Sequence, residues 1–254
     1  MDNQQQIDEL IRIAIREDIG DGDHTTLSCI PPSLIGKAQL IVKDEGIICG
    51  VDVVRRVFEI FDPRVSMNVF IKDGTPVKKG DIAFIVEGPS VSLLQCERLV
   101  LNFMQRLSGV ATQTSHYVEL LKGTNTKILD TRKTTPGMRL LEKYAVKMGG
   151  GENHRIGLYD MILIKDNHID FAGGVTKALE KTNQYLKEKG KDLKIVIEAR
   201  TMKDIQDILD FGGVFRILID NFTPEQTKDA IKLFNGRVKT ESSGGITMKY
   251  IREY

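Results

Sequence analysis

Short apolar runs alternate with helical patterns along the second half of this 254-residue chain. Strands separated by helices of about 10–15 residues form βαβ units, in which successive strands lie parallel in one sheet. The alternation therefore predicts a parallel α/β sheet, open or closed into a barrel, although five clear units do not support a regular eight-fold barrel. The expected strands are Lys127–Leu129, Met161–Ile164, Ile195–Ile197, Ile217–Ile219 and Arg237–Thr240, with helices near 138–148 and 174–187 and others beginning near 202, 224 and 247.

The chain before residues 107–110 follows a different pattern. Apolar positions at helical spacing predict a helix over 7–15, and alternation predicts strands over 38–42 and 65–71. A longer helix is expected from near Ser92, and its apolar face would carry Leu93, Cys96, Val100, Phe103 and Leu107. The change of pattern predicts one domain over 1–108, which includes this long helix, and a catalytic domain over 109–254.

Two features of the N-terminal half have ordinary interpretations. The acidic residues of 17–26 faintly resemble a calcium loop, but no glutamate stands at the twelfth position, so a connecting loop is preferred. Cys29, Cys49 and Cys96 are odd in number and widely spaced. That spacing argues against a disulfide framework and a zinc site, and it favours buried structural thiols in a reducing compartment.

Composition narrows the classes of function. The formal net charge is +1, so no overall field attracts nucleic acid or an anionic membrane surface. The apolar runs are far shorter than the roughly 20 residues of a membrane-spanning helix, and the polar N-terminus lacks the residue order of a signal peptide. A cytoplasmic protein with no nucleic-acid or membrane partner is therefore expected.

Charged or glycine-rich segments follow all five expected strands of the second half. Ligands of parallel α/β proteins bind at the carboxyl ends of the strands, so these segments are predicted to form one site. The segments are Asp130-Thr131-Arg132-Lys133, Lys165-Asp166-Asn167-His168, Glu198, Asp220-Asn221 and Glu241-Ser242-Ser243-Gly244-Gly245.

The charges of this region suggest two kinds of substrate group. Its cations would bind several carboxylates or phosphates, with which arginine forms bidentate pairs. Glu198 and Asp220 would repel such anions unless they bind hydroxyls or a divalent cation, and magnesium held by carboxylates and a polyphosphate satisfies both conditions. The residues predict a magnesium-dependent transferase or lyase acting on a phosphorylated sugar and an acidic small molecule. The cations are Arg132, Lys133, Arg155 and Lys165.

Two further features allow alternative interpretations. A helix after Ser243-Gly244-Gly245 would direct free N–H groups at a phosphate, while the alternative is an ordinary helix N-cap. Arg98 points away from the apolar face of its helix, so it is either a solvated side chain or one that reaches a neighbouring subunit. The sequence contains no nucleophile elbow, Walker motif or strand-linked dinucleotide fingerprint.

Several long motifs carry a family resemblance. They are Asp130-Thr131-Arg132-Lys133-Thr134-Thr135-Pro136-Gly137, Gly149-Gly150-Gly151-Glu152-Asn153-His154-Arg155 and Leu163-Ile164-Lys165-Asp166-Asn167-His168. Shorter segments, Cys96-Glu97-Arg98, Asp220-Asn221-Phe222 and Glu241-Ser242-Ser243-Gly244-Gly245-Ile246, extend the match over most of the chain. Together they resemble the quinolinate phosphoribosyltransferase (decarboxylating) family, also called nicotinate-nucleotide pyrophosphorylases.

The resemblance implies an N-terminal α/β sandwich domain and an open, incomplete α/β barrel of parallel strands, assembled as a homodimer. It also implies a reaction of NAD biosynthesis in which quinolinate and 5-phosphoribosyl 1-pyrophosphate yield nicotinate mononucleotide, pyrophosphate and carbon dioxide. Mg²⁺ would accompany the pyrophosphate of the donor.

The resemblance also implies roles for individual residues. Glu198 and Asp220 would bind the ribose hydroxyls and magnesium, and Arg98 would enter the neighbouring subunit's site. Thr131 is counted among the substrate-binding residues, and Lys133, Lys165, Glu198 and Asp220 among the catalytic ones. The quinolinate carboxylates would be bound by Arg132, His154, Arg155 and Lys165, and the phosphoribosyl donor by Lys133, Lys165 and, around its 5-phosphate, Ser243, Gly244 and Gly245.

The sequence departs from the family in two places. Arg200 stands where the family often has an acidic residue, so the charge near the magnesium is expected to differ. Family members continue after the segment matching Ile246 into a strand and a loop that contribute to phosphate binding, whereas this chain ends at Tyr254. The alternatives are a paralogous enzyme of the same fold that acts on another acid, and a non-catalytic anion-binding protein.

Overall fold

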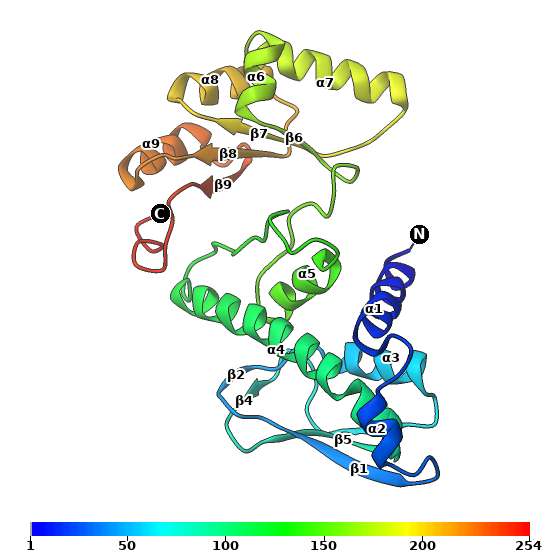
Figure 1. The fold of residues 1–254 in the computed structure, drawn as a ribbon. Coiled ribbons are helices and arrows are strands. Elements are labelled where there is room, and N and C mark those ends of the chain that lie inside the picture. The colour runs from blue at the N-terminus through cyan, green and yellow to red at the C-terminus, as the bar shows by residue number, and fades with distance from the viewer. Residues whose placement is uncertain (1) are drawn as a thin grey trace. The chain divides into compact units, whose positions relative to one another are not determined.

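The structure of the chain, a computed structural model, describes residues 2–254 and divides into two compact units (Figure 1). The first unit ends at His154 and the second begins at Arg155. The domain boundary expected at 108/109 falls inside helix α4 (Ser90–Leu120) and stays a prediction. No helix among residues 2–254 has both the length and the apolar character needed to cross a membrane.

Two antiparallel sheets form the β structure of the first unit. In the larger sheet β5 lies between β1 and β3, so that Val86 faces Ala38 on one side and Met67 on the other. The strands expected over 38–42 and 65–71 are confirmed as β1 and β3. The larger sheet contains β1 (Ile35–Ile41), β3 (Ser66–Val69) and β5 (Ile82–Pro89), and the smaller one β2 (Gly46–Ile47) and β4 (Pro76–Val77).

The 31-residue helix α4 packs against both sheets and against the four other helices of the first unit. The predicted orientation of its faces is confirmed, because Cys96 and Phe103 are buried while Arg98 is exposed. The remaining helices of this unit are α1 (Asn3–Ile19), α2 (His24–Cys29), α3 (Val51–Phe61) and α5 (Arg139–Met148).

Two expectations for the first unit are wrong in part. Helix α2 begins inside the expected connecting loop, because Asp23 accepts the backbone N–H of Thr26 at 3.0 Å and caps the helix. Cys29 is exposed, whereas Cys49 and Cys96 are buried as expected. Burial raises the pKa of the Cys96 thiol to about 12, so it behaves as a structural residue rather than a nucleophile.

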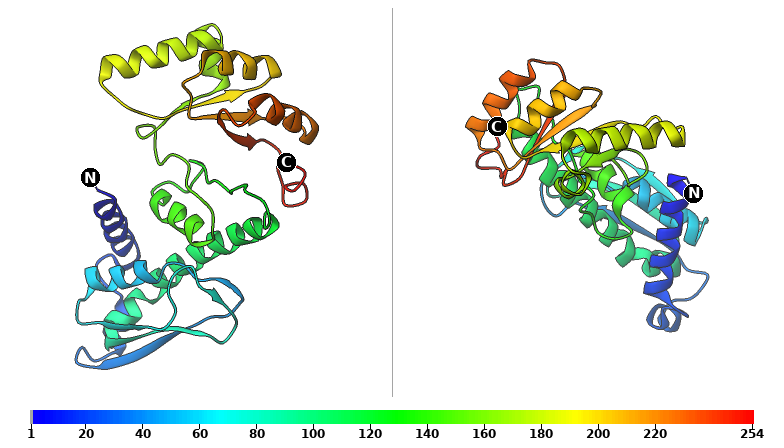
Figure 2. Two further views of the ribbon diagram at one scale, coloured as in Figure 1. Left: turned by 180° about the vertical axis from the view of Figure 1, so that it is seen from behind. Right: turned by 90° about the horizontal axis from the view of Figure 1, so that it is seen from above.

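Four parallel strands, in the order β6-β7-β8-β9, form the sheet of the second unit, and helices α6 to α9 lie over one face of it (Figure 2). Within residues 155–254 the sheet is open, with β6 and β9 at its edges. This arrangement confirms the predicted parallel α/β architecture. The strands are β6 (Ile162–Ile164), β7 (Ile195–Ala199), β8 (Arg216–Asp220) and β9 (Lys239–Ser243), and the helices α6 (Asp166–Ala172), α7 (Val175–Lys189), α8 (Met202–Phe211) and α9 (Pro224–Phe234).

Local sequence explains where these elements begin. Every residue of β7 is buried, as a central strand of a parallel sheet requires. Thr201 and Thr223 form capping boxes at the starts of α8 and α9, and Pro224 occupies the first turn of α9. The helices expected from 202 and 224 therefore begin where predicted.

Three expectations for the second half are wrong. Residues 127–129 form no strand, because only Leu129 finds a parallel partner, Glu152, directly after a glycine-rich turn. The seven-residue helix α6 was not expected, since it is too short to display a helical repeat. Residues 248–253 form turns instead of the expected last helix, because Ile251 alone among residues 247–254 is buried and cannot anchor an amphipathic face.

Gly149 supports a test of the packing between α4 and α5. A Cβ added to Gly149 would lie 2.7 Å from Cβ of Thr114 and would also meet the carbonyl of Ala111. We expect Gly149→Ala to lower the free energy of unfolding by about 1–3 kcal/mol, because the two helices must separate to make room. Urea unfolding measures this change. The control Lys147→Ala, at an exposed position of α5, should change stability by less than about 0.5 kcal/mol, and equal effects of the two substitutions would contradict the packing argument.

Candidate functional site

The second unit brings four of the predicted site segments to one edge of its sheet. Lys165 directly follows β6, Glu198 lies near the end of β7, and Asp220 and Ser243 are the last residues of β8 and β9. All four strands are parallel, and Asp220 pairs with Ser243 in register. Their carboxyl ends therefore lie side by side, which is where parallel α/β proteins bind ligands.

Glu198 joins β7 to the beginning of α6. Its buried carboxylate accepts the backbone N–H of Asp166 at 3.0 Å and lies 3.8 Å from Nζ of Lys165. The side chain of Lys165 is half exposed, so its ammonium group can reach a ligand while it remains near this carboxylate. The pair presents a negative and a positive charge next to each other at the sheet edge.

Asn221 fixes the backbone between β8 and β9. Its side-chain amide donates to Asp220 Oδ2 at 2.8 Å, and its backbone N–H donates to the Ser243 carbonyl at 2.8 Å. Gly244 adopts a φ of +93°, and a Cβ at this position would lie 2.6 Å from Cγ of Asn221. Only glycine fits at position 244, because Asn221 fills the space of a Cβ, whereas the space beside Gly245 is open within 4 Å and a ligand can approach there.

The helix expected after Gly245 does not form in the described structure, and the prediction that a helix N-terminus binds phosphate here is therefore wrong. The N–H groups of Tyr250 and Ile251 instead donate to the Thr247 carbonyl within a series of turns. The alternative interpretation of this segment as a helix N-cap is wrong for the same reason. An anion could still bind the glycine backbone itself, as in other concave turns of successive N–H groups.

The first unit holds Thr131, Arg132, Lys133 and His154. The backbone N–H of Lys133 donates to Oγ1 of Thr131 at 3.0 Å, which turns the chain directly after Asp130. Nε of Arg132 is buried and has no hydrogen-bond partner within residues 2–254. Leaving a guanidinium N–H unsatisfied is costly, so this arginine is well suited to receive an acceptor from an anionic ligand.

Glu142 of α5 holds the other end of this loop. Its carboxylate accepts the backbone N–H of Thr135 at 3.1 Å and the guanidinium of Arg106 at 2.5 and 2.9 Å. Burial by itself raises the pKa of Glu142, but the hydrogen bonds from Arg106 and Thr135 outweigh it and bring the pKa below its ordinary value. The loop that carries Arg132 and Lys133 is thus fastened by a buried charge.

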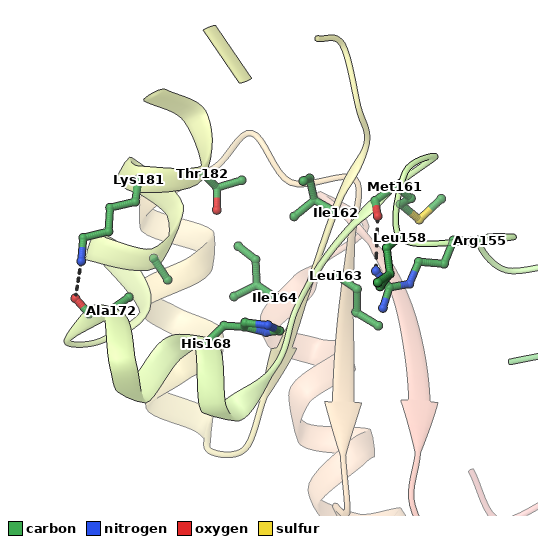
Figure 3. Close-up of a pocket in the computed structure, with 11 residues that line it drawn as sticks. Arg155, Leu158, Met161, Ile162, Leu163, Ile164, His168, Ala172, Lys181 and Thr182 are labelled. Carbon is green, nitrogen blue, oxygen red and sulfur yellow. Dashed lines mark hydrogen bonds between the residues drawn. The ribbon is translucent and has the colours of Figure 1, made fainter. Parts of the chain in front are cut away.

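Arg155, the first residue of the second unit, lines a cavity of about 360 Å³ beside β6 (Figure 3). Its Nη1 donates to the Met161 carbonyl at 3.4 Å. Apolar side chains make up most of the wall, while His168 and Lys181 supply polar groups, and Lys181 donates to the Ala172 carbonyl at 3.2 Å. Among the predicted binding residues, only Arg155 lines this cavity.

The two remaining arginines of interest lie elsewhere. Arg98 is exposed on α4. Arg200 forms a bidentate pair with Asp170 of α6 at 2.6 and 3.0 Å, which lowers the pKa of Asp170. The positive charge at position 200, where the family often has an acidic residue, is therefore balanced by a neighbouring carboxylate.

No cluster of three or more His, Cys, Asp or Glu side chains in residues 2–254 could hold a metal ion by itself. Glu198 and Asp220, on neighbouring strands, nevertheless supply two carboxylates at the same edge. Two carboxylates fit a magnesium ion whose other ligands come from water and a polyphosphate, because Mg²⁺ is seldom enclosed by protein ligands alone.

Sequence reasoning missed Glu142 and Lys143, and it placed Asp166 in a site segment without predicting the role of its backbone N–H. The first two lie on a predicted helix, where no spacing signal distinguishes a buried charge from a solvated one. Asp166 acts through its backbone N–H, so its side-chain chemistry carries no signal for this role.

Two family models cover most of the chain, and they meet near residue 109 rather than at the border between the two compact units. Residues 23–108 match the family model for the N-terminal domain of quinolinate phosphoribosyl transferase, and residues 110–254 match the model for its C-terminal domain. A probable nicotinate-nucleotide pyrophosphorylase [carboxylating] of Bacillus subtilis is 41% identical over 97% of this chain and 84% of its own length. Quinolinate phosphoribosyltransferase [decarboxylating] 2b, mitochondrial, of Nicotiana tabacum is 38% identical over 96% and 74%, respectively. The crystal structure of NadC from Streptococcus pyogenes superimposes with a TM-score of 0.92 at 39% identity, covering 99% of this chain and 87% of that one.

The contacts of Glu142 predict a specific dependence of stability on pH. Its folded-state pKa is lowered, so its contribution to stability is present above the ordinary value of 4.5 and is lost as the pH falls through the folded-state pKa. We expect Glu142→Gln to cost about 1.5–3 kcal/mol at pH 7, because charge-assisted hydrogen bonds are lost, and progressively less below pH 4.5.

Urea midpoints measured from pH 7 to pH 3 test this expectation. Glu119→Gln, which removes an exposed charge paired with Lys122, is the matched control and should have little effect at any pH. A stability difference between Glu142→Gln and the parent protein that stays constant over this range would contradict the assignment.

Proposed function

The chain belongs to the quinolinate phosphoribosyltransferase family, and on this premise we propose that it transfers the phosphoribosyl group of 5-phosphoribosyl 1-pyrophosphate to quinolinate, with decarboxylation. The products are nicotinate mononucleotide, pyrophosphate and carbon dioxide. The observation that carries the proposal is the row of Lys165, Glu198, Asp220 and Ser243 along one edge of a parallel sheet. Both acidic and basic groups are available there for a sugar phosphate.

Quinolinate carries two carboxylates, which require cations with good hydrogen-bond geometry. In the first unit Arg132 and His154 supply such groups, and the unsatisfied Nε of Arg132 supports this role. Arg155 and Lys165 are proposed as further cations for the carboxylates, and Thr131 would contribute a hydroxyl. Arginine suits a planar carboxylate better than lysine does, because its N–H groups form a fixed fork.

The phosphoribosyl donor carries hydroxyls, a 5-phosphate and a pyrophosphate. Glu198 and Asp220 would accept hydrogen bonds from the ribose hydroxyls, and Ser243, Gly244 and Gly245 would surround the 5-phosphate. The left-handed backbone at Gly244 and Gly245 supports this assignment, since nothing lies within 4 Å of the Cβ position of Gly245 and its side of the turn is open. Lys133 and Lys165 would lie along the pyrophosphate.

The two carboxylates Glu198 and Asp220 would also hold Mg²⁺ together with the donor's pyrophosphate. A bound magnesium ion neutralises charge on the departing pyrophosphate. Lys133 and Lys165 add to this effect, because cations aimed at developing negative charge stabilise the transition state.

Loss of pyrophosphate builds positive character at the sugar carbon, which the pyridine nitrogen of quinolinate then attacks. Arg132, His154 and Arg155 would orient that nitrogen by binding the carboxylates. Holding the two reactants in a reactive orientation lowers the entropic part of the activation barrier. The adjacent carboxylate then leaves as carbon dioxide, the electron pair of the broken bond stays on the ring carbon, where the quaternary nitrogen stabilises it, and that carbon takes a proton from water. This sequence requires no covalent intermediate on the protein.

The proposal includes a homodimer in which Arg98 enters the site of the neighbouring subunit. Its exposed position on α4, directed away from the core of its own subunit, supports this role. A cytoplasmic location is also proposed, since the three free cysteines suit a reducing compartment.

Lys165→Ala tests the centre of the proposed site. We expect kcat/KM for nicotinate mononucleotide formation to fall by about 10²–10³, because a cation next to the departing charge is removed. The measurement is a spectrophotometric assay with quinolinate, the donor and magnesium, repeated with a chelator, which should abolish product formation.

The exposed control Lys187→Ala should retain parental activity. Turnover of nicotinate in place of quinolinate would point to a different acid substrate. Binding of quinolinate without any product would point to an anion-binding protein.

Mixing two inactive variants tests the role of Arg98. An Arg98→Ala subunit paired with a Lys165→Ala subunit contains one site with both residues, if Arg98 acts across the interface. Random reassociation of equal amounts should therefore restore about a quarter of the parental activity, since half of the dimers are mixed and each has one intact site. If Arg98 acts within its own subunit, the mixture should remain inactive.

A further inference from the structure

Lys143 of α5 is a buried lysine outside the proposed binding groups. Its side chain is 1% exposed. Its ammonium group forms an ion pair with Asp130 and donates a hydrogen bond to the His154 carbonyl at 3.1 Å. It therefore contacts two segments at once, one at Asp130, two residues before Arg132, and the other at His154 itself.

Asp130 completes this connection from the opposite side. It accepts the backbone N–H of His154 at 2.8 Å, and its own backbone N–H donates to the Glu152 carbonyl at 3.1 Å. In the amide orientation that its neighbours require, Asn153 donates to Asp130 Oδ2 at 2.8 Å and to the Lys143 carbonyl at 2.9 Å. The network joins residues that lie 24 positions apart in the sequence.

A buried ion pair of this kind contributes little net stability to the folded protein. Removing both charges from water costs much of what their attraction returns, and an apolar pair of similar volume is often as stable. Burial raises the pKa of Asp130, while the hydrogen bonds from Lys143 and from the His154 N–H act in the opposite direction. What the charged pair provides beyond stability is a fixed geometry, because each polar group has a directional partner.

We propose that Lys143 is a positioning residue for the dicarboxylate substrate. It holds Asp130 and the His154 carbonyl, and so fixes the backbone of Arg132 and that of His154 relative to each other. This inference rests on the proposed function. Lys143 would not touch the substrate, and its effect would be transmitted through the two residues that do.

The role predicts a selective effect on binding. Loss of the ammonium group should let the segments at Arg132 and His154 shift, which weakens binding of the substrate that both residues contact. The groups proposed for the ribose and its 5-phosphate belong to the second unit, and among the donor's proposed groups only Lys133 belongs to the loop that begins at Asp130. A general loss of folding would instead affect both substrates alike.

Steady-state kinetics of Lys143→Met and of the double variant Asp130→Asn/Lys143→Met test the proposal. The double variant leaves no buried charge without its partner, so it guards against simple unfolding. For both variants we expect KM for quinolinate to rise about 10- to 100-fold, because both of its displaced groups bind it, and KM for the donor to rise several-fold less, because Lys133 is the one donor group in the same loop. Lys147→Met, an exposed change on the same helix, is the control. Circular dichroism and thermal melting establish that each variant is folded.

The outcomes separate this inference from the proposed function. An inactive parent protein would overturn the proposed function, and the inference with it. An active parent, with a folded variant whose KM for quinolinate is unchanged or whose two KM values rise equally, would overturn the inference alone. If neither variant folds, Lys143 serves stability only and the inference is equally overturned. Direct titration of quinolinate into the folded variants should repeat the kinetic loss of affinity.

Discussion

The parallel pairing of β6 to β9 is the constraint on which the candidate site of the second unit depends. The carboxyl ends of parallel strands lie at the same edge of the sheet. The backbone alone therefore brings residues that are far apart in sequence close together. The register then sets the details, since Asp220 faces Ser243 across a hydrogen-bonded ladder. The short helix α6 adds a backbone N–H for Glu198, and the sheet edge thereby gains an ordered carboxylate.

In the first unit, the segment that carries the proposed binding cations is held in place by buried ion pairs instead of a parallel sheet. Its cationic segment follows no regular strand, and it would be loose if hydrogen bonds of the main chain were its sole support. Two consecutive residues of α5 supply what is missing. Glu142 holds the loop at Thr135, and Lys143 holds its beginning at Asp130. Buried charge therefore substitutes for a β-ladder in this part of the chain.

The sequence predicted the parallel sheet well because apolar β-branched runs and threonine caps are local signals. The central strand β7 and the capped helices α8 and α9 are examples. It predicted the shortest elements poorly. Leu129 pairs with a residue beyond a glycine turn, and the residues after Thr247 bury a single side chain. Both outcomes depend on tertiary contacts that no local pattern records.

The candidate site shows the same division. Charged residues at strand ends were identified from their order along the chain, whereas the groups that hold them were not. Lys143 and Glu142 have the composition of an ordinary solvated helix face, and only packing makes them buried. Asp166 contributes its backbone N–H, and the identity of a residue does not indicate how its backbone N–H is used.

Helix α4 has a consequence for how such a chain can change in length during evolution. Its 31 residues span about 46 Å, with Arg98 in the first third and the contact with Gly149 in the last third. Inserting one residue between them would rotate one part against the other by about 100°. The arginine and the α5 contact could not both keep their directions. Insertions and deletions should therefore be tolerated in the surface loops and rejected within this helix, whose length fixes the relative direction of the two features.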